Sequence, residues 1–213
     1  MTETIKKAPY AVAAYLAREH GFNGLQALLQ SDRYTLVGLF THRLLPKSED
    51  LQRGERPEFS RYEQLCQQHD VPLWSIDSSK EVGQIGAALA DLTIDLNASI
   101  SWRFLIPSEH LALASMGGVN LHRGRLPQYA GAEPVKRMLL DEVADVCIAA
   151  HVLDEEIDAG EVLQEVTHPL TCDQDLPLTD QVEQVKRDLT PYFGPLLIEA
   201  LDTMVERYEQ QHG

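Results

Sequence analysis

The chain has 213 residues, 44% of them hydrophobic, and a formal net charge of −15. This length suffices for one domain with a buried core and is short for two, so we expect residues 1–213 to form a single domain. The acidic charge disfavours a protein that binds DNA or RNA through phosphates, although an anionic small molecule needs only a local cationic pocket.

The cysteines and the apolar runs indicate in which cellular compartment the protein resides. Cys66, Cys147 and Cys172 lie far apart and form no CxxC pair, so the sequence suggests neither a disulfide framework nor a zinc knuckle. No apolar run approaches the ~20 residues of a membrane-spanning helix, and residues 1–9 lack the apolar segment of a signal peptide. We therefore expect a cytoplasmic protein with no membrane partner.

Apolar and β-branched runs alternate with stretches of helical periodicity along the chain. We expect seven strands, at 10–16, 34–41, 71–76, 94–102, 118–121, 146–152 and 162–166. We expect helices at 25–29, 60–69, 80–92 and 107–115, from 131 onward, and from 176 to the end with a break at Pro191. This alternation predicts an α/β fold with an open, mostly parallel twisted sheet and helices on both faces.

Several local features carry interpretations of their own. The segment after the first strand contains no GxGxxG or GxxxxGK[ST] phosphate motif, so we interpret Gly21 and Gly24 as turn and cap residues. Ser60 is the expected cap of the helix that it begins, and 42–59 is an expected excursion over a strand end. Five histidines show no pattern of partners, and we expect them at the surface: His20, His42, His69, His110 and His168.

The stretch 117–131, GGVNLHRGRLPQYAG, concentrates the polar groups of greatest chemical interest. Asn120 and His122 are two residues apart, which places both side chains on one side of an extended chain. One is an uncharged amide donor, and the other changes protonation near neutral pH. Such a pair at the end of an apolar strand is typical of a site that stabilises a developing oxyanion. A satisfied buried polar pair is the alternative.

The loop 151–160 contains four acidic residues within five positions. Three of them fit a solvated turn, whereas Asp158 precedes Ala-Gly and an apolar strand and can point inward. A carboxylate near His122 would orient the imidazole and raise its pKa, but spacing alone does not establish this pairing. Cys147, His151 and Asp158 could also form a metal site, which the single cysteine and loose spacing disfavour, so we expect no metal.

The order Asn-x-His, Leu-Pro-x-Tyr-x-Gly and Ile-Asp-Ala-Gly resembles the folate-dependent formyltransferases. This family includes glycinamide ribonucleotide transformylase, methionyl-tRNA formyltransferase, sugar-nucleotide N-formyltransferases and formyltetrahydrofolate hydrolase. The resemblance is specific over 102–164 and faint from Tyr10. It implies a Rossmann-like formyltransferase fold with 10-formyltetrahydrofolate as co-substrate and no metal. It also implies folate-binding residues on two loops: Trp102, Arg103, Phe104, Leu105, Leu153, Asp154, Glu155, Glu156 and Ile157.

The resemblance also implies a mechanism with Asn120, His122 and Asp158 as the catalytic residues. An amine attacks the formyl carbon, and the Asn120 amide and protonated His122 hold the tetrahedral oxyanion. Asp158 stabilises the imidazolium and helps, through a water, to remove the proton from the amine.

Departures from the family bear on the acceptor. The loop after the first strand lacks the Gly-Asn-Gly-Ser type of phosphate cradle, which disfavours glycinamide ribonucleotide. The chain ends at Gly213 without the C-terminal barrel that methionyl-tRNA formyltransferases use, so we expect no nucleic-acid partner. The segments 39–42 and 102–106 look closest to sugar-nucleotide N-formyltransferases. Four residues are candidate substrate contacts, although the two arginines could instead obstruct the substrate: Arg123, Arg125, Tyr129 and Gly131.

We therefore expect formyl transfer from 10-formyltetrahydrofolate to the primary amine of a small, phosphorylated substrate, with an amino-sugar nucleotide as the first candidate. Glycinamide ribonucleotide is the second candidate, and transfer to water by a hydrolase is the third. A non-catalytic folate- or nucleotide-binding module is the alternative from a different class. A homodimer is also possible.

Overall fold

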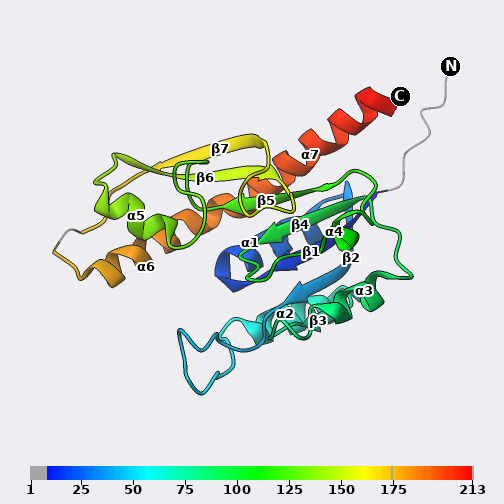
Figure 1. Cartoon of the computed structure of the whole chain (residues 1–213), viewed down its shortest axis with the longest axis horizontal. Helices are drawn as coiled ribbons and strands as arrows, with labels where there is room; N and C mark the ends of the chain where they lie inside the picture. Colours follow the sequence, from blue (N-terminus) through cyan, green and yellow to red (C-terminus); the bar gives the residue numbers. More distant parts are fainter. Residues whose placement is uncertain (1–8, 174, 213) are drawn as a thin grey trace.

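A computed structural model describes residues 9–173 and 175–212, in which seven strands form one sheet in the order β3-β2-β1-β4-β5-β6-β7 (Figure 1). Strands β1 to β5 are parallel, β6 is antiparallel to β5, and β7 is antiparallel to β6. This confirms the expected open, mostly parallel sheet. The strands are β1 (Tyr10–Leu16), β2 (Tyr34–Thr41), β3 (Leu73–Ser75), β4 (Leu96–Ile100), β5 (Gly118–His122), β6 (Asp145–Val152) and β7 (Val162–Pro169).

Helices cover both faces of the sheet (Figure 1). One apolar cluster packs α1, α2, α5, α6 and α7 against the sheet, and a second packs α3, α4 and the segment 102–106 against the opposite face. The helices are α1 (Arg18–Gln30), α2 (Phe59–Gln68), α3 (Gly83–Leu89), α4 (Ser108–Leu111), α5 (Pro134–Leu140), α6 (Leu178–Leu189) and α7 (Phe193–His212), with a 3₁₀ turn η1 (Thr190–Tyr192) before α7. None of these helices is long and apolar enough to cross a bilayer.

The interior strand β1 is buried on both faces because its side chains alternate between the two clusters. Val12, Ala14 and Leu16 belong to one cluster, and Ala13 and Tyr15 belong to the other. An interior parallel strand of this kind is expected to read as a continuous apolar run, which is why 10–16 was recognisable in the sequence.

Helix α1 corrects two interpretations. It begins at Arg18, directly after β1, and contains Gly21 and Gly24 within its length, so these glycines are neither turn nor cap residues. A Cβ atom at Gly24 would lie 2.6 Å from Cδ1 of Ile100, and one at Gly21 would lie 2.6 Å from the Tyr62 hydroxyl oxygen. The glycines therefore permit close packing of the helix on the sheet and on α2.

Other element ends also differ from expectation. Ser60 does not cap α2, because the helix begins at Phe59 and Glu58 takes the cap position without a side-chain hydrogen bond. The third helix is confined to Gly83–Leu89, and α5 begins at Pro134 rather than at residue 131.

The expectation of surface histidines is wrong for three of the five. His20, His42 and His110 are buried, whereas His69 is exposed and His168 is half-buried. His42 is 1% exposed, and its Nδ1 donates to the Ile76 carbonyl at 2.6 Å. Local backbone partners of this kind satisfy a buried imidazole, and they leave no signature in the spacing of histidines along the sequence.

Candidate active site

Strand β5 delivers Asn120 and His122 to the edge of the sheet where the parallel strands end. Val119 and Leu121 are buried in the core, whereas Asn120 and His122 alternate with them and are half-buried. The expected placement of the two polar side chains on one side of the strand is therefore confirmed. Asn120 lies opposite Ser99 of β4 and opposite His151 of β6 in the sheet register.

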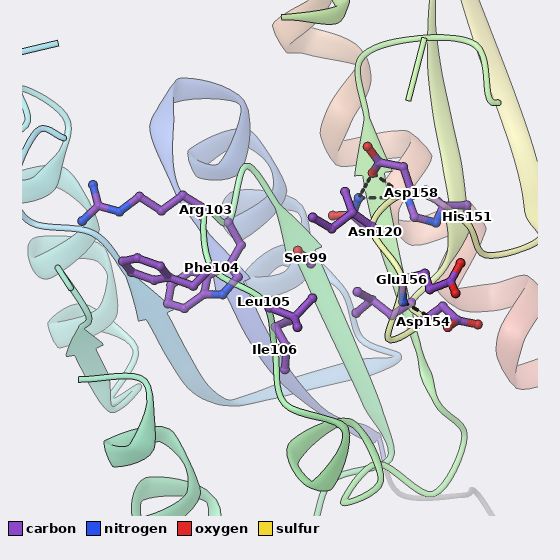
Figure 2. A pocket seen from close by; sticks show the side chains of 13 residues that line it. Ser99, Arg103, Phe104, Leu105, Ile106, Asn120, His151, Asp154, Glu156 and Asp158 are labelled. Atoms are coloured by element: carbon purple, nitrogen blue, oxygen red, sulfur yellow. Dashed lines mark hydrogen bonds and ion pairs between the residues drawn. The ribbon is translucent and has the colours of Figure 1, made fainter. Parts of the chain in front are cut away.

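Asp158, from the loop between β6 and β7, points inward to meet both side chains. Its Oδ2 lies 3.1 Å from Nδ1 of His122 and accepts a hydrogen bond from the Gly131 N–H at 2.8 Å. Its Oδ1 accepts a longer contact of 3.5 Å from Nδ2 of Asn120 (Figure 2). Asp158 has a positive φ of 53°, which turns the chain sharply and lets the carboxylate face β5. The structure thus brings the three residues together.

His151 is a fourth member of this group, and the sequence reasoning considered it only as a metal ligand. Nδ2 of Asn120 and Nε2 of His151 are 2.9 Å apart, and Nδ1 of His151 lies 2.9 Å from the Val152 carbonyl (Figure 2). Because a carbonyl can only accept, Nδ1 donates, and Nε2 is the ring nitrogen that accepts from the Asn120 amide. Cys147 lines a different cavity from His151, and the described residues contain no cluster of metal ligands.

The protonation of Asp158 and His122 follows from burial and from their contacts. Burial by itself raises the pKa of Asp158, but the Gly131 N–H and the neighbouring His122 hold this pKa below its ordinary value. Burial lowers the pKa of His122, while Asp158 and the Tyr129 carbonyl act in the opposite direction without overcoming it. Nε2 of His122 lies 2.8 Å from the Tyr129 carbonyl oxygen. Both ring nitrogens of His122 therefore face hydrogen-bond acceptors. The neutral ring can donate to only one of them, whereas the imidazolium can donate to both.

A pocket of about 150 Å³ opens beside Asn120. The segment 102–106 forms one wall and 153–158 forms the other (Figure 2). Eight of the nine residues expected to bind folate line it, and Glu155 is the exception. Leu105 and Ile157 are 58% and 73% exposed at this pocket, so two large apolar side chains are available to a ligand. His122 lies outside the lining.

The guanidinium of Arg103 is directed away from Asn120 (Figure 2). It donates to the carbonyl of Asp77 at 2.6 Å and to that of Leu44 at 3.3 Å. The backbone N–H of Arg103 donates to Nε2 of His42, and the His42 ring stacks on Trp102 with 4.4 Å between the ring centroids. These contacts hold the wall 102–106 against the loops that follow β2 and β3.

The candidate substrate contacts separate into different regions. Arg125 lies on the outside, 3.5 Å from Asp145 and 3.8 Å from Glu165, and it does not line the pocket beside Asn120. The Tyr129 hydroxyl donates to Asp141 at 3.0 Å, and only the Tyr129 carbonyl reaches His122. Gly131 contributes its N–H to Asp158. Arg123 lines a separate cavity.

Comparisons with known proteins identify the family to which this chain belongs. A family model described as formyl transferase matches residues 26–191. The chain belongs to the formyl transferase family. It is 30% identical over 202 residues to a methionyl-tRNA formyltransferase from Bacteroides fragilis, covering 95% of this chain and 58% of that protein. It is 28% identical over 149 residues to one from a Nostoc species, covering 70% and 41%. The chain thus spans about half the length of these curated relatives.

Solved structures of formyl transferase relatives share the fold of this family member. A glycinamide ribonucleotide transformylase from Symbiobacterium toebii superposes with a TM-score of 0.69 at 15% identity, covering 92% of this chain and 87% of that one. A formyltetrahydrofolate deformylase from Pseudomonas syringae gives 0.68 at 15% identity, covering 91% and 62%. At such identities the likeness shows the fold alone.

Proposed function

We propose that this formyl transferase family protein transfers the formyl group of 10-formyltetrahydrofolate to a primary amine of a small anionic substrate, with an amino-sugar nucleotide as the first candidate. The observation that carries the proposal is the convergence of Asn120, His122 and Asp158 beside a pocket with apolar walls. An amide donor next to a carboxylate–imidazole pair can stabilise an oxyanion and accept protons from an attacking amine.

Asn120 is the direct donor in this proposal. One proton of its amide is held by His151 at 2.9 Å, and the other points toward Asp158 at 3.5 Å. The longer contact is the weaker one, so a substrate oxygen can replace it without disturbing His151. The amine attacks the formyl carbon, and the oxyanion that forms accepts a hydrogen bond from this N–H of Asn120. Collapse of the tetrahedral intermediate then breaks the bond between the formyl carbon and N10 of the folate, and tetrahydrofolate leaves.

His122 and Asp158 supply charge and proton transfer. His122 donates to the oxyanion after its Nε2–H exchanges the Tyr129 carbonyl for the substrate oxygen. Asp158 is ionised because its pKa is low, so it stabilises positive charge on His122 as the oxyanion forms. Through a water, Asp158 also relays the proton that leaves the ammonium nitrogen to N10 of the departing tetrahydrofolate. The folate occupies the pocket between 102–106 and 153–158, where Leu105 and Ile157 offer apolar contact to its ring.

A tRNA acceptor is the second candidate, because the curated relatives are named methionyl-tRNA formyltransferases. The net charge of −15 opposes it. The experiment is to follow the absorbance of 10-formyltetrahydrofolate with amino-sugar nucleotides, glycinamide ribonucleotide, methionyl-tRNA or no acceptor. Loss that depends on one amine identifies the acceptor. Loss without any amine identifies a hydrolase, and folate binding without turnover identifies a binding module.

A further inference from the structure

The loop 126–131, between β5 and α5, supplies one backbone group to each member of the imidazole–carboxylate pair. The Tyr129 carbonyl oxygen lies 2.8 Å from Nε2 of His122. The Gly131 N–H donates to Oδ2 of Asp158 at 2.8 Å, and this carboxylate lies 3.1 Å from the imidazole. The directions in which the two backbone groups point therefore determine the hydrogen bonds of both side chains.

The Gly131 N–H and the Ala130 carbonyl belong to one peptide group. A trans peptide is planar, so its N–H and its carbonyl point in opposite directions and can only turn together. Gly131 has a positive φ of 82°, a region that glycine enters without steric cost. A Cβ atom at Gly131 would meet no atom of the described chain within 4 Å. This peptide therefore needs another group to keep it in one orientation.

Arg137 of α5 holds the carbonyl end of this peptide. Its Nη2 donates to the Ala130 carbonyl oxygen at 2.5 Å, and its Cζ lies 5.8 Å from the centroid of the Tyr129 ring. The Tyr129 hydroxyl donates at 3.0 Å to Asp141, which directly follows α5. The helix thus fixes the loop 126–131 through a charged donor and through an aromatic side chain.

A cationic donor on the carbonyl also affects the N–H at the other end of the peptide. Hydrogen bonds from charged donors are stronger than neutral ones, and hydrogen bonds that share a peptide polarise one another. Here the bonds run from the Arg137 guanidinium through the Ala130–Gly131 peptide to the Asp158 carboxylate. Because the Gly131 N–H helps to lower the pKa of Asp158, this arrangement favours the ionised carboxylate.

The surroundings of Arg137 separate this effect from direct ligand binding and from simple stabilisation. Arg137 does not line the pocket beside Asn120. Its Nε is buried without a hydrogen-bond partner among the described residues. An unsatisfied buried donor costs free energy, so stability alone is a poor reason for an arginine at this position. The bond from Nη2 to the loop accounts for the orientation of the guanidinium.

We propose that Arg137 is a positioning residue of the candidate active site, which keeps the Gly131 N–H directed at Asp158 by holding the Ala130 carbonyl. The orientation of the peptide stands on the contacts alone, whereas its effect on turnover rests on the function proposed above. Asp158 also faces two titratable groups, His122 and His151. Every variant below retains both, so a change in the titration of Asp158 reports on the peptide.

The first experiment measures hydrogen exchange of the Gly131 amide by NMR in the whole protein without ligand. Arg137→Met keeps an apolar stem but cannot donate, and we expect this amide to exchange about tenfold or more faster. Arg137→Lys keeps a cationic donor and should restore part of the protection. Lys136→Met is the control, because Lys136 also lies on α5 but pairs with Glu133 at 3.5 Å.

The second experiment follows the side-chain carboxyl carbon of Asp158 by NMR as pH is varied. We expect the midpoint to rise by about one pH unit in Arg137→Met, because a weaker hydrogen bond to the carboxylate favours the protonated form. Lys136→Met should leave it in place. If Arg137 served stability alone, Tm would fall while the midpoint stayed unchanged.

Unchanged Gly131 exchange or an unchanged Asp158 midpoint in a folded Arg137→Met protein would overturn the proposal. If circular dichroism shows that Arg137→Met does not fold, Arg137→Lys is compared with the wild type by the same two criteria.

The third experiment concerns turnover, once formyl transfer has been measured in the wild type. We expect Arg137→Met to lower kcat by about tenfold or more and to leave KM for 10-formyltetrahydrofolate unchanged, because Arg137 lies outside the pocket lining. The acid limb of the kcat profile should move to higher pH together with the Asp158 midpoint. An unchanged kcat despite altered exchange and titration would overturn the effect on turnover alone. Altered exchange and titration in a protein whose wild type transfers no formyl group would instead show that the function proposed above is wrong.

Discussion

Nδ2 of Asn120 lies 2.9 Å from Nε2 of His151, across the antiparallel pairing of β5 and β6. This contact fixes the amide in the pocket so that one of its two protons stays committed to His151. The other proton, directed toward Asp158, is the one that the proposed chemistry uses. His151 therefore acts as a positioning residue, and the geometry of the site depends on strand register as well as on the catalytic side chains.

Replacing His151 tests this dependence. In His151→Leu the amide of Asn120 loses its acceptor, and we expect kcat to fall by about tenfold or more with little change in the KM for folate. His151→Gln should recover part of kcat, because a side-chain carbonyl can accept from the same amide. His168→Leu is the control, since His168 contacts Tyr192 rather than the site. Equal kcat in the leucine and glutamine variants would remove the positioning role.

Replacing the carboxylate of Asp158 tests whether turnover depends on the negative charge of this side chain. Asp158→Asn keeps an oxygen that can accept from the Gly131 N–H, so we expect a folded protein by circular dichroism. Turnover should fall by roughly 10²–10³, the usual cost of losing one electrostatic contribution to an oxyanion site. Glu161→Gln removes a charge from the same hairpin, where Glu161 pairs with Arg207, and should retain activity. Wild-type rates in Asp158→Asn would exclude Asp158 from the mechanism.

The protonation of His122 can be followed directly by NMR titration of its ring protons. We expect a midpoint below the ordinary value of about 6.5. Asp158→Asn should move the midpoint further down, because Asp158 raises the pKa of His122. Glu161→Gln should leave it in place. An upward shift in Asp158→Asn would mean that the 3.1 Å contact between Nδ1 and the carboxylate does not exist in solution.

His42 makes stability depend on pH. Burial lowers the pKa of His42 to about 3, so between pH 6.5 and 3 the unfolded chain binds a proton that the folded chain rejects. The free energy of unfolding therefore falls as pH falls through this window, by about 1 kcal/mol per pH unit. His42→Asn keeps a donor for the Ile76 carbonyl but cannot titrate. Urea unfolding at pH 7, 6 and 5 should show a flatter dependence in this variant.

An unchanged slope in His42→Asn would mean that His42 takes up its proton in the folded state. His20 and His122 also have lowered pKa values, so a reduced slope should remain in the variant. The control is His69→Asn at an exposed position.

The sequence indicated the fold and part of the site through local periodicity. The continuous apolar run of β1 and the alternation in β5 identified the strands and placed Asn120 and His122 on one side. Asp158 needed the family resemblance, because its contact with His122 spans a loop whose turn is set by a positive φ.

Features that depend on packing between distant elements could not be predicted from the sequence. His151 meets Asn120 through the pairing of β5 with β6. A register shift between Ala150 and His151 in the neighbouring β6–β7 pairing interrupts the regular alternation of side chains, so the sequence alone does not show which face of β6 carries His151. Gly21 and Gly24 resemble helix breakers, yet they lie within α1 where it packs closely against its neighbours. Arg123 and Arg125 are two residues apart but line different cavities, because they lie beyond the last residue of β5.

The most direct test of the proposed chemistry is the loss of 10-formyltetrahydrofolate absorbance at fixed protein concentration, with and without an amino-sugar nucleotide, in the wild type and in Asn120→Ala. We expect amine-dependent loss in the wild type and a rate about 10²–10³ lower in Asn120→Ala, with both proteins folded. Equal rates in the two proteins, or no loss with any amine tested, would contradict the assignment of this site to formyl transfer.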